Sequence, residues 1–152
     1  MDNVRDLLKK SGYSDKAIDY YEKKLNVGKI ENPDAYFMYT GPCGDTVEIF
    51  LKIESNIIKE AKFRAIGCAG SFVSGSALTE IIKGKTLDEA EEIDENDIIR
   101  HLGKIPAPKI HCACLSKRTL QKAIRQYKEK SKKRGGNEMN KALSEPPTEM
   151  EV

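Results

Sequence analysis

Two adjacent stretches of alternating apolar and polar residues constrain this fold more than any other feature of the sequence. Apolar side chains occupy every second position in residues 47–54, and the alternation resumes in residues 57–66. Ser55-Asn56 lies between them and is a turn signal. Because successive side chains of a strand point to opposite faces, the pattern predicts an antiparallel hairpin with one covered face. Phe50 is the exception, an aromatic residue on the polar side.

A further strand and several helices are expected around this hairpin. Residues 35–40 predict a strand before it, which makes a three-stranded antiparallel meander. Pro106 and Pro108 predict an extended segment over residues 105–109. Apolar spacing and capping residues predict helices over residues 1–12, from Ser14 to Gly28, over 72–83, from Thr86, from Asn96 or Asp97 to Gly103, and over 114–132.

Length and charge exclude several classes of protein. The chain has 152 residues, enough for one domain, and its 26 basic and 24 acidic residues leave a net charge of +2. We therefore expect no nucleic-acid partner, and we interpret the basic residues of 128–134 as a solvated helix end. No apolar run spans a bilayer, and the start does not resemble a signal peptide, so we expect no membrane partner and a cytoplasmic protein. Residues 1–134 are expected to form the domain, and residues 135–152 a disordered tail.

Three of the four cysteines lie at the junctions between these elements. Cys43 lies in a glycine-rich loop between two strands, Cys68 where a strand gives way to a helix, and Cys112 between the extended segment and the last helix. Helix N-termini lower the pKa of a thiol and favour the thiolate, which binds metal and attacks sulfur. The alternative for each cysteine is a small buried apolar residue. Core cysteines should instead fall on apolar faces, so the set favours a shared site.

Two further side chains add different donor atoms to these thiols. Asp45 follows Cys43 by two residues and His111 precedes Cys112, although a turn residue and an ordinary histidine are the alternatives. Thiolates with one oxygen or nitrogen donor can hold an iron–sulfur cluster or zinc. The cysteine spacing fits no zinc finger. Cys114 is open to three interpretations: a core residue, a spare ligand, or a thiol that relays sulfur to or from Cys112.

The ordered motifs resemble the IscU/NifU N-terminal-domain family of iron–sulfur cluster assembly scaffold proteins. The resemblance extends from the second expected helix to the end of the last one, so that residues 1–12 form an N-terminal extension. It implies an α+β fold and a scaffold rather than an enzyme. The residues that carry it are Cys43-Gly44-Asp45, Gly67-Cys68, Lys109-Ile110-His111-Cys112 and Lys83-Gly84-Lys85-Thr86-Leu87-Asp88-Glu89-Ala90.

The same resemblance implies a ligand set and a sulfur chemistry. Cys43, Cys68 and Cys112 would hold the cluster, with Asp45 or His111 as the fourth ligand. We expect a 2Fe–2S cluster, with 4Fe–4S as the alternative and zinc as an occupant of the apo form. A cysteine desulfurase would supply sulfur as a persulfide on Cys112 or Cys68, and acceptor proteins would take the cluster. We also expect a homodimer to accompany cluster loading.

Two other functions fit the same residues. One is a zinc-bound protein that accepts sulfur from a desulfurase but builds no cluster, and the other is an interaction module with core cysteines. The chain also departs from the family at Ile105-Pro106-Ala107-Pro108-Lys109, where one proline of the usual chaperone-recognition segment is displaced. The sequence therefore does not support dependence on a DnaK-type chaperone.

Overall fold

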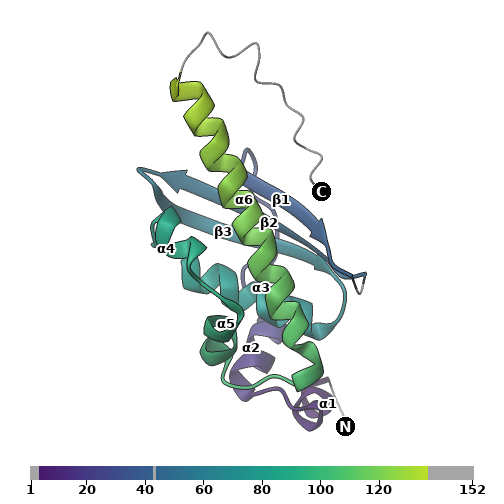
Figure 1. Ribbon diagram of the computed structural model, residues 1–152. Coiled ribbons are helices and arrows are strands. Elements are labelled where there is room, and N and C mark those ends of the chain that lie inside the picture. Colours follow the sequence, from purple (N-terminus) through teal and green to yellow (C-terminus); the bar gives the residue numbers. More distant parts are fainter. Residues whose placement is uncertain (1–3, 43, 137–152) are drawn as a thin grey trace.

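The computed structural model describes residues 4–42 and 44–136 (Figure 1). Within these residues a three-stranded antiparallel sheet is combined with six α-helices, which confirms the predicted α+β fold. A 3-10 turn, η1 (Ala107–Lys109), leads into the last helix. The other elements, in chain order, are α1 (Val4–Ser11), α2 (Asp15–Lys23), β1 (Ala35–Thr40), β2 (Thr46–Glu54), β3 (Ile57–Ile66), α3 (Ala69–Ile82), α4 (Leu87–Glu91), α5 (Glu95–Leu102) and α6 (Ile110–Gly136).

The sheet is the meander that the alternating pattern predicts. Its strand order is β1-β2-β3, and both pairs are antiparallel. Ser55 and Asn56 connect β2 to β3 with φ angles of 53° and 67°, the left-handed conformation that a two-residue hairpin requires. The strands observed for residues 35–40 and 57–66 have the predicted bounds, and β2 begins one residue earlier than expected.

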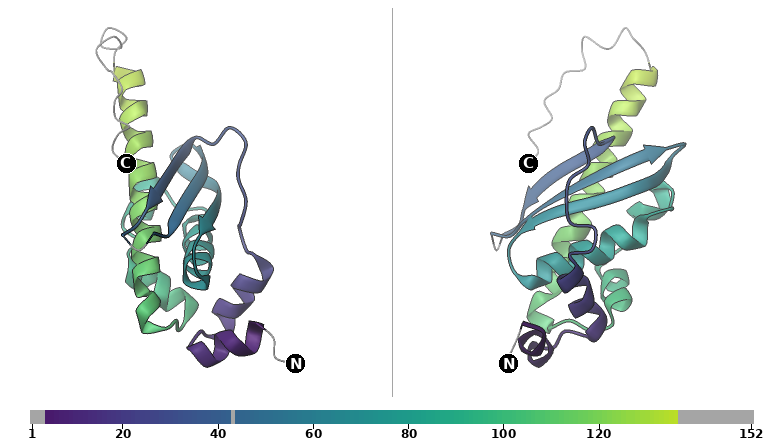
Figure 2. Two further views of the ribbon diagram at one scale, coloured as in Figure 1. Left: turned by 90° about the vertical axis from the view of Figure 1, so that its right-hand side faces the viewer. Right: turned by 180° about the vertical axis from the view of Figure 1, so that it is seen from behind.

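One face of the sheet is covered by α3 and α6 (Figures 1 and 2). Val47, Ile49 and Phe63 lie on this face and are fully buried, so they form the centre of the core. The opposite face carries Glu48 and Arg64, which form an ion pair. Phe50 also lies on this opposite face, yet it is buried beneath Tyr36 and Arg64, whose ring and guanidinium lie 5.0 and 5.4 Å from its ring centre.

The approach of α3 to β3 depends on a glycine. A Cβ added to Gly75 would lie 2.5 Å from two ring carbons of Phe63, closer than any real Cβ contact. The ring therefore packs directly on the helix backbone. This close approach holds α3 against β3, and only two residues separate the end of that strand from the start of the helix.

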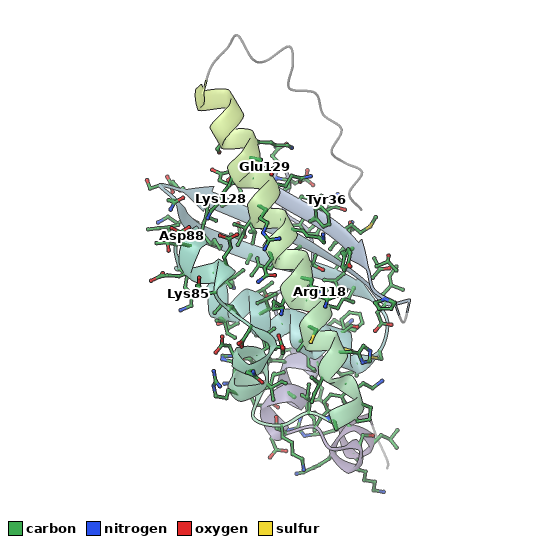
Figure 3. The ribbon with its side chains drawn as sticks, in the orientation of Figure 1. Tyr36, Lys85, Asp88, Arg118, Lys128 and Glu129 are labelled. Atoms are coloured by element: carbon green, nitrogen blue, oxygen red, sulfur yellow. The ribbon has the colours of Figure 1, made fainter. Side chains whose placement is uncertain are left out.

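The longest helix, α6, crosses the covered face and projects beyond the sheet at its C-terminal end (Figures 1 and 2). Lys128 on α6 is paired with Asp88 of α4 at 2.6 Å, which links the short α4 to the long helix (Figure 3). Among residues 4–42 and 44–136, no helix combines the length and the apolar character that crossing a membrane requires.

The predicted helix caps are confirmed where a hydroxyl begins the helix. Ser14 caps α2 through a bond from the Ala17 N–H, and Thr86 and Glu89 form both bonds of a capping box on α4. The helix α5 has Asp94 as its N-cap, before either of the predicted starts, Asn96 or Asp97, and it has a capping box of its own.

The segment before α6 differs from the prediction. Residues 105–109 are not extended throughout, because Ala107–Lys109 form η1, and α6 begins at Ile110 rather than at about Cys114. Pro108 lies in a first helical turn, where its missing N–H would have had no partner in any case. Helix α6 continues to Gly136, past the predicted end at 132. Residues 135 and 136, predicted as the start of the disordered tail, belong to this helix, and the rest of that predicted tail, from position 137, lies outside the described residues.

Candidate metal centre

The sheet register brings two of the sequence motifs together. Thr46 at the start of β2 lies opposite Ile66 at the end of β3. Asp45 immediately precedes Thr46, and Gly67-Cys68 immediately follow Ile66, so the two motifs meet at one end of the sheet. Helix α6 packs against α3 and adds His111 and Cys112 from its first turn. The site thus draws on three segments that are distant in the sequence.

Two glycines allow this close approach. A Cβ on Gly67, whose φ is 158°, would lie 2.6 Å from the carboxyl carbon of Asp45. A Cβ on Gly70 would lie 3.0 Å from Sγ of Cys112. Only glycine permits such contact with the backbone. The carboxylate and the thiol can therefore reach the start of α3, where Cys68 is the N-cap residue.

Cys68, Cys112 and Asp45 form the centre of the site. The two Sγ atoms are 3.6 Å apart, and Oδ2 of Asp45 lies 3.8 Å from Sγ of Cys68 and 4.0 Å from Sγ of Cys112. Two sulfurs and a carboxylate oxygen that converge in this way match the donors that proteins use for zinc and iron. Cys43, the third predicted thiol, lies outside the described residues, so its place at the site stays a prediction.

His111 joins the site through its Nε2 atom. Its Nδ1 is 2.8 Å from the carbonyl oxygen of Pro108, and its Nε2 is 3.7 Å from Sγ of Cys112. Because a carbonyl only accepts, Nδ1 carries the proton in the neutral ring and Nε2 keeps a free lone pair. Asp45, His111 and Cys112 each have a ligand atom within 4.8 Å of the others. This tautomer leaves Nε2 available to a metal.

The two thiols differ in acidity although they touch. Burial acts to raise the pKa of Cys68, but N–H groups of Ser71 and Gly70, the Cys112 thiol and the charge of Lys109 together lower it below the ordinary value. Cys112 is fully buried, and that burial, together with the neighbouring Cys68, raises the pKa of its thiol to about 12. The sequence interpretation placed Cys112 ahead of a helix, whereas the structure places it within α6.

Two residues at the site escaped sequence reasoning. Ser71 in the first turn of α3 is fully buried, and its hydroxyl donates to Oδ2 of Asp45 at 2.8 Å. Tyr13 is also buried, its hydroxyl has no hydrogen-bond partner among the described residues, and burial followed by the charges of Cys68 and Cys112 raises its pKa. In the sequence, only its position one turn after Cys68 could have indicated that Ser71 belongs to the site.

Cys114 lies on a different side of α6 from Cys112. It borders a cavity of about 260 Å³ that Asp45 and His111 also line, together with Leu115 and Arg118, which is labelled on α6 in Figure 3. Cys114 is partly exposed. The thiol therefore neighbours two residues of the site without joining the Cys68–Cys112 pair.

The α+β fold gathers two thiols, a carboxylate and an imidazole at one end of its sheet, which are the donor types found in the class of proteins that bind metal through cysteine. Comparison with known proteins identifies the family within this class. The model of the NifU-like N terminal domain matches residues 12–134. The chain belongs to this family, which confirms the resemblance in its motifs.

Several relatives carry the name of iron–sulfur cluster assembly scaffold or assembly protein. The IscU protein of Plasmodium falciparum is 43% identical over 122 residues, which cover 78% of this chain and 75% of that protein. The IscU scaffold protein of Escherichia coli K12 is 41% identical over 123 residues, covering 78% of this chain and 95% of that protein. These homologues support a scaffold role, which fits the prediction of a protein that is not an enzyme.

Solved structures agree with the fold. A putative iron–sulfur cluster assembly scaffold protein for the SUF system, from Fervidobacterium islandicum AW-1, superimposes with a TM-score of 0.61 at 30% identity, covering 74% of this chain and 96% of that chain. A NifU-like N-terminal protein from Brucella abortus gives a TM-score of 0.63 at 18% identity, over 77% and 94% of the two chains. The second likeness concerns the fold alone.

Proposed function

We propose that this chain is a scaffold on which an iron–sulfur cluster is assembled and from which it is passed to acceptor proteins. The observation that carries the proposal is the convergence of Cys68 and Cys112, 3.6 Å apart, on one oxygen of Asp45. Family membership supports the proposal, because relatives that are 42% and 41% identical to this chain are named as such scaffolds. The cluster is cargo rather than a resident cofactor.

The donor set suits a cargo that must leave again. Thiolates of Cys43, Cys68 and Cys112 hold two irons with bridging sulfides, and Asp45 or His111 supplies the fourth ligand. A 4Fe–4S cluster would use the same residues. Four thiolates would hold a cluster more firmly, whereas one oxygen or nitrogen donor is released more readily. Asp45→Ala should therefore change the rate of transfer to an acceptor, and an unchanged rate with full loading would contradict its role.

Sulfur arrives in this proposal as a persulfide on a cysteine desulfurase. An acceptor thiolate attacks the terminal sulfur, a new S–S bond forms, the S–S bond of the donor breaks, and the donor cysteine leaves as a thiolate. Cys112 and Cys68 are the candidate acceptors, with Cys114 as a relay. The exposure and lowered pKa of Cys68 favour direct attack, whereas buried Cys112 accepts sulfur only after the site opens. Peptide mapping by mass spectrometry after desulfurase treatment identifies the modified thiol.

Anaerobic reconstitution with iron, sulfide and a reductant tests the scaffold function. We expect a visible chromophore that is lost when Cys43, Cys68 or Cys112 is changed to serine. The Cys114→Ser variant is the matched control, because that thiol lies outside the pair and should not be needed for the chromophore. A wild-type protein that forms no chromophore would refute the proposal.

A zinc-bound sulfur acceptor is the second candidate function. The approach of oxygen, nitrogen and sulfur atoms from Asp45, His111 and Cys112 to within 4.8 Å of one another favours it, since zinc binds such mixed donors tetrahedrally. Zinc in a purified sample does not decide between the two functions, because an apo scaffold binds zinc as well. A protein that accepts persulfide with zinc bound, and never forms a cluster, would be this second kind.

The remaining expectations extend the same proposal. We place the protein in the cytoplasm, where thiols stay reduced, with a desulfurase and acceptor proteins as partners. Residues 1–134 form the scaffold unit, and two copies associate when the cluster is loaded. Nucleic acid, a membrane and a DnaK-type chaperone are not among the proposed partners. Size-exclusion chromatography of the apo and loaded forms measures the change in oligomeric state.

A further inference from the structure

The hydroxyl of Ser71 makes an unusual bond for a buried helical serine. In helices such hydroxyls commonly bond to the carbonyl one turn earlier, as Thr79 does with Gly75 in the same helix. Ser71 instead donates to Oδ2 of Asp45 at 2.8 Å, across to another segment of the chain. Its own N–H is bonded to the Cys68 carbonyl at 3.0 Å, which fixes the serine within the turn that carries the thiol.

The oxygen that Ser71 holds is the one that faces the thiols. Oδ2 of Asp45 lies 3.8 Å from Sγ of Cys68 and 4.0 Å from Sγ of Cys112. On its other side the carboxyl group lies against the backbone of Gly67, where an added Cβ would lie 2.6 Å from the carboxyl carbon. The hydroxyl of Ser71 therefore holds the carboxylate oxygen that lies near both sulfurs.

We propose that Ser71 is a positioning residue that orients the Asp45 carboxylate for metal capture by the apo protein. This inference rests on the proposed function, in which Asp45 is a ligand. Hydrogen bonds to a ligating carboxylate hold its orientation before the metal arrives, and the loss of such a bond typically weakens metal binding by about 10- to 100-fold. Without the hydroxyl, Asp45 has to be ordered by the metal itself, so the affinity falls.

The test is a Co²⁺ titration of the reduced full-length chain under anaerobic conditions, followed by the thiolate-to-cobalt and d–d absorption bands. We expect Ser71→Ala to weaken Co²⁺ binding about tenfold and to shift the d–d bands, because the oxygen donor is lost or loosened. Ser71→Thr keeps the hydroxyl and should restore most of the affinity. If the added methyl group impairs folding of that variant, shown by circular dichroism, the double variant described below decides instead.

The matched control lies one turn further along the same helix. Ser74 is also fully buried, but its hydroxyl has no partner among the described residues. Ser74→Ala removes the same atom from the same helix, so it should leave the Co²⁺ affinity and spectrum unchanged. An equal loss in both variants would overturn the proposal, because it would reflect general loosening of α3.

A double variant shows whether Ser71 acts through Asp45. Because Ser71 also lies close to the Cys112 thiol, its loss could act on sulfur instead. We expect Ser71→Ala to have no further effect in an Asp45→Ala background. A full additional loss there would overturn the proposal, as would an Asp45→Ala variant that binds Co²⁺ normally. Failure of the scaffold function is distinguishable, because it would appear as the absence of a chromophore when the unchanged protein is reconstituted with iron and sulfide, whereas the Co²⁺ titration reports on the metal site alone.

Discussion

At the scale of single residues, the two described thiols of the site are chemically unequal. Cys68 is partly exposed at the N-cap of α3, and Cys112 is buried in the first turn of α6. N–H groups directed at Cys68 favour its thiolate, while burial favours the protonated form of Cys112. The Cys68 thiol is therefore the more reactive nucleophile in the folded apo protein, and the Cys112 thiol is the less reactive one.

This inequality predicts the order of alkylation. Iodoacetamide should modify Cys68 faster than Cys112 in the folded apo protein, and the rate at Cys68 should rise with pH around a midpoint below the usual value for cysteine. Peptide mapping by mass spectrometry at several pH values measures both rates. In denaturant the two rates should become equal. Faster modification of Cys112 in the folded protein would contradict the described packing.

The raised pKa of Cys112 predicts a loss of stability at alkaline pH. The pKa of Cys112 in the folded protein, about 12, exceeds the ordinary value of 9.0. The contribution of this thiol to the free energy of unfolding is therefore fully present below pH 9.0. It is lost as pH rises toward the folded pKa, because the unfolded chain then releases a proton that the folded chain retains.

Urea denaturation at several pH values between the two pKa values checks this expectation. The free energy of unfolding should fall by up to about 1.4 kcal/mol per pH unit from this group alone. Cys112→Ser removes the titrating proton, so its slope should be shallower than that of the unchanged protein. Identical slopes would mean that Cys112 does not control this pH dependence.

At the scale of elements, the contact between α3 and β3 is the most restrictive packing. Gly75→Ala should destabilise the fold by about 1–3 kcal/mol from overpacking, less the gain of up to about 1 kcal/mol from the helix propensity of alanine. The cause is the approach of the new Cβ to the Phe63 ring. Chemical denaturation measures the change.

A second substitution provides the control for this prediction. Phe63→Leu gives the new methyl group space. The double variant should therefore lose less free energy of unfolding than the sum of the losses in the two single variants. Strict additivity would show that the glycine is needed for some other reason than contact with the ring.

Strands were easier to predict than the start of α6. Alternation over residues 47–54 and 57–66 follows directly from one covered face, so the bounds were nearly correct. Before α6, the rule that proline disfavours helix led to an extended segment over 105–109. Pro108 instead lies in the turn that starts the helix, and the local sequence does not distinguish these two outcomes.

The grouping of the site residues was predictable, but the residue that contacts them was not. Asp45, His111, Cys68 and Cys112 lie close together as predicted, because their chemistry and their positions between elements marked them, while their role as ligands stays a prediction. Ser71 was missed, since its bond to Asp45 depends on the register that places Thr46 opposite Ile66. No rule of local sequence states which buried hydroxyl will meet a carboxylate from another strand.

At the scale of the whole molecule, metal binding should be coupled to folding. The donors come from the loop before β2, from the start of α3 and from α6, so a bound ion joins three segments that the unfolded chain keeps apart. We expect Zn²⁺ at about 100 times its dissociation constant to stabilise the fold by about 2.7 kcal/mol.

Thermal unfolding followed by circular dichroism measures this stabilisation as a rise in Tm, which a chelator should reverse. Cys68→Ser is expected to lose most of the rise, and Cys114→Ser to keep it. A rise of the same size in the Cys68→Ser protein would place the ion elsewhere.

The bridges that flank β3 have a consequence for contact with other chains. Val27 pairs with Phe63 and Thr86 pairs with Ile57, so residues outside the sheet already use hydrogen-bonding positions near both ends of the outer edge of β3. An added strand would have to displace these bridges before it could lie along that side. Among residues 4–42 and 44–136, β1 pairs only with β2 and has no comparable bridge along its other edge. A strand from another molecule would therefore meet fewer existing bonds at β1 than at β3.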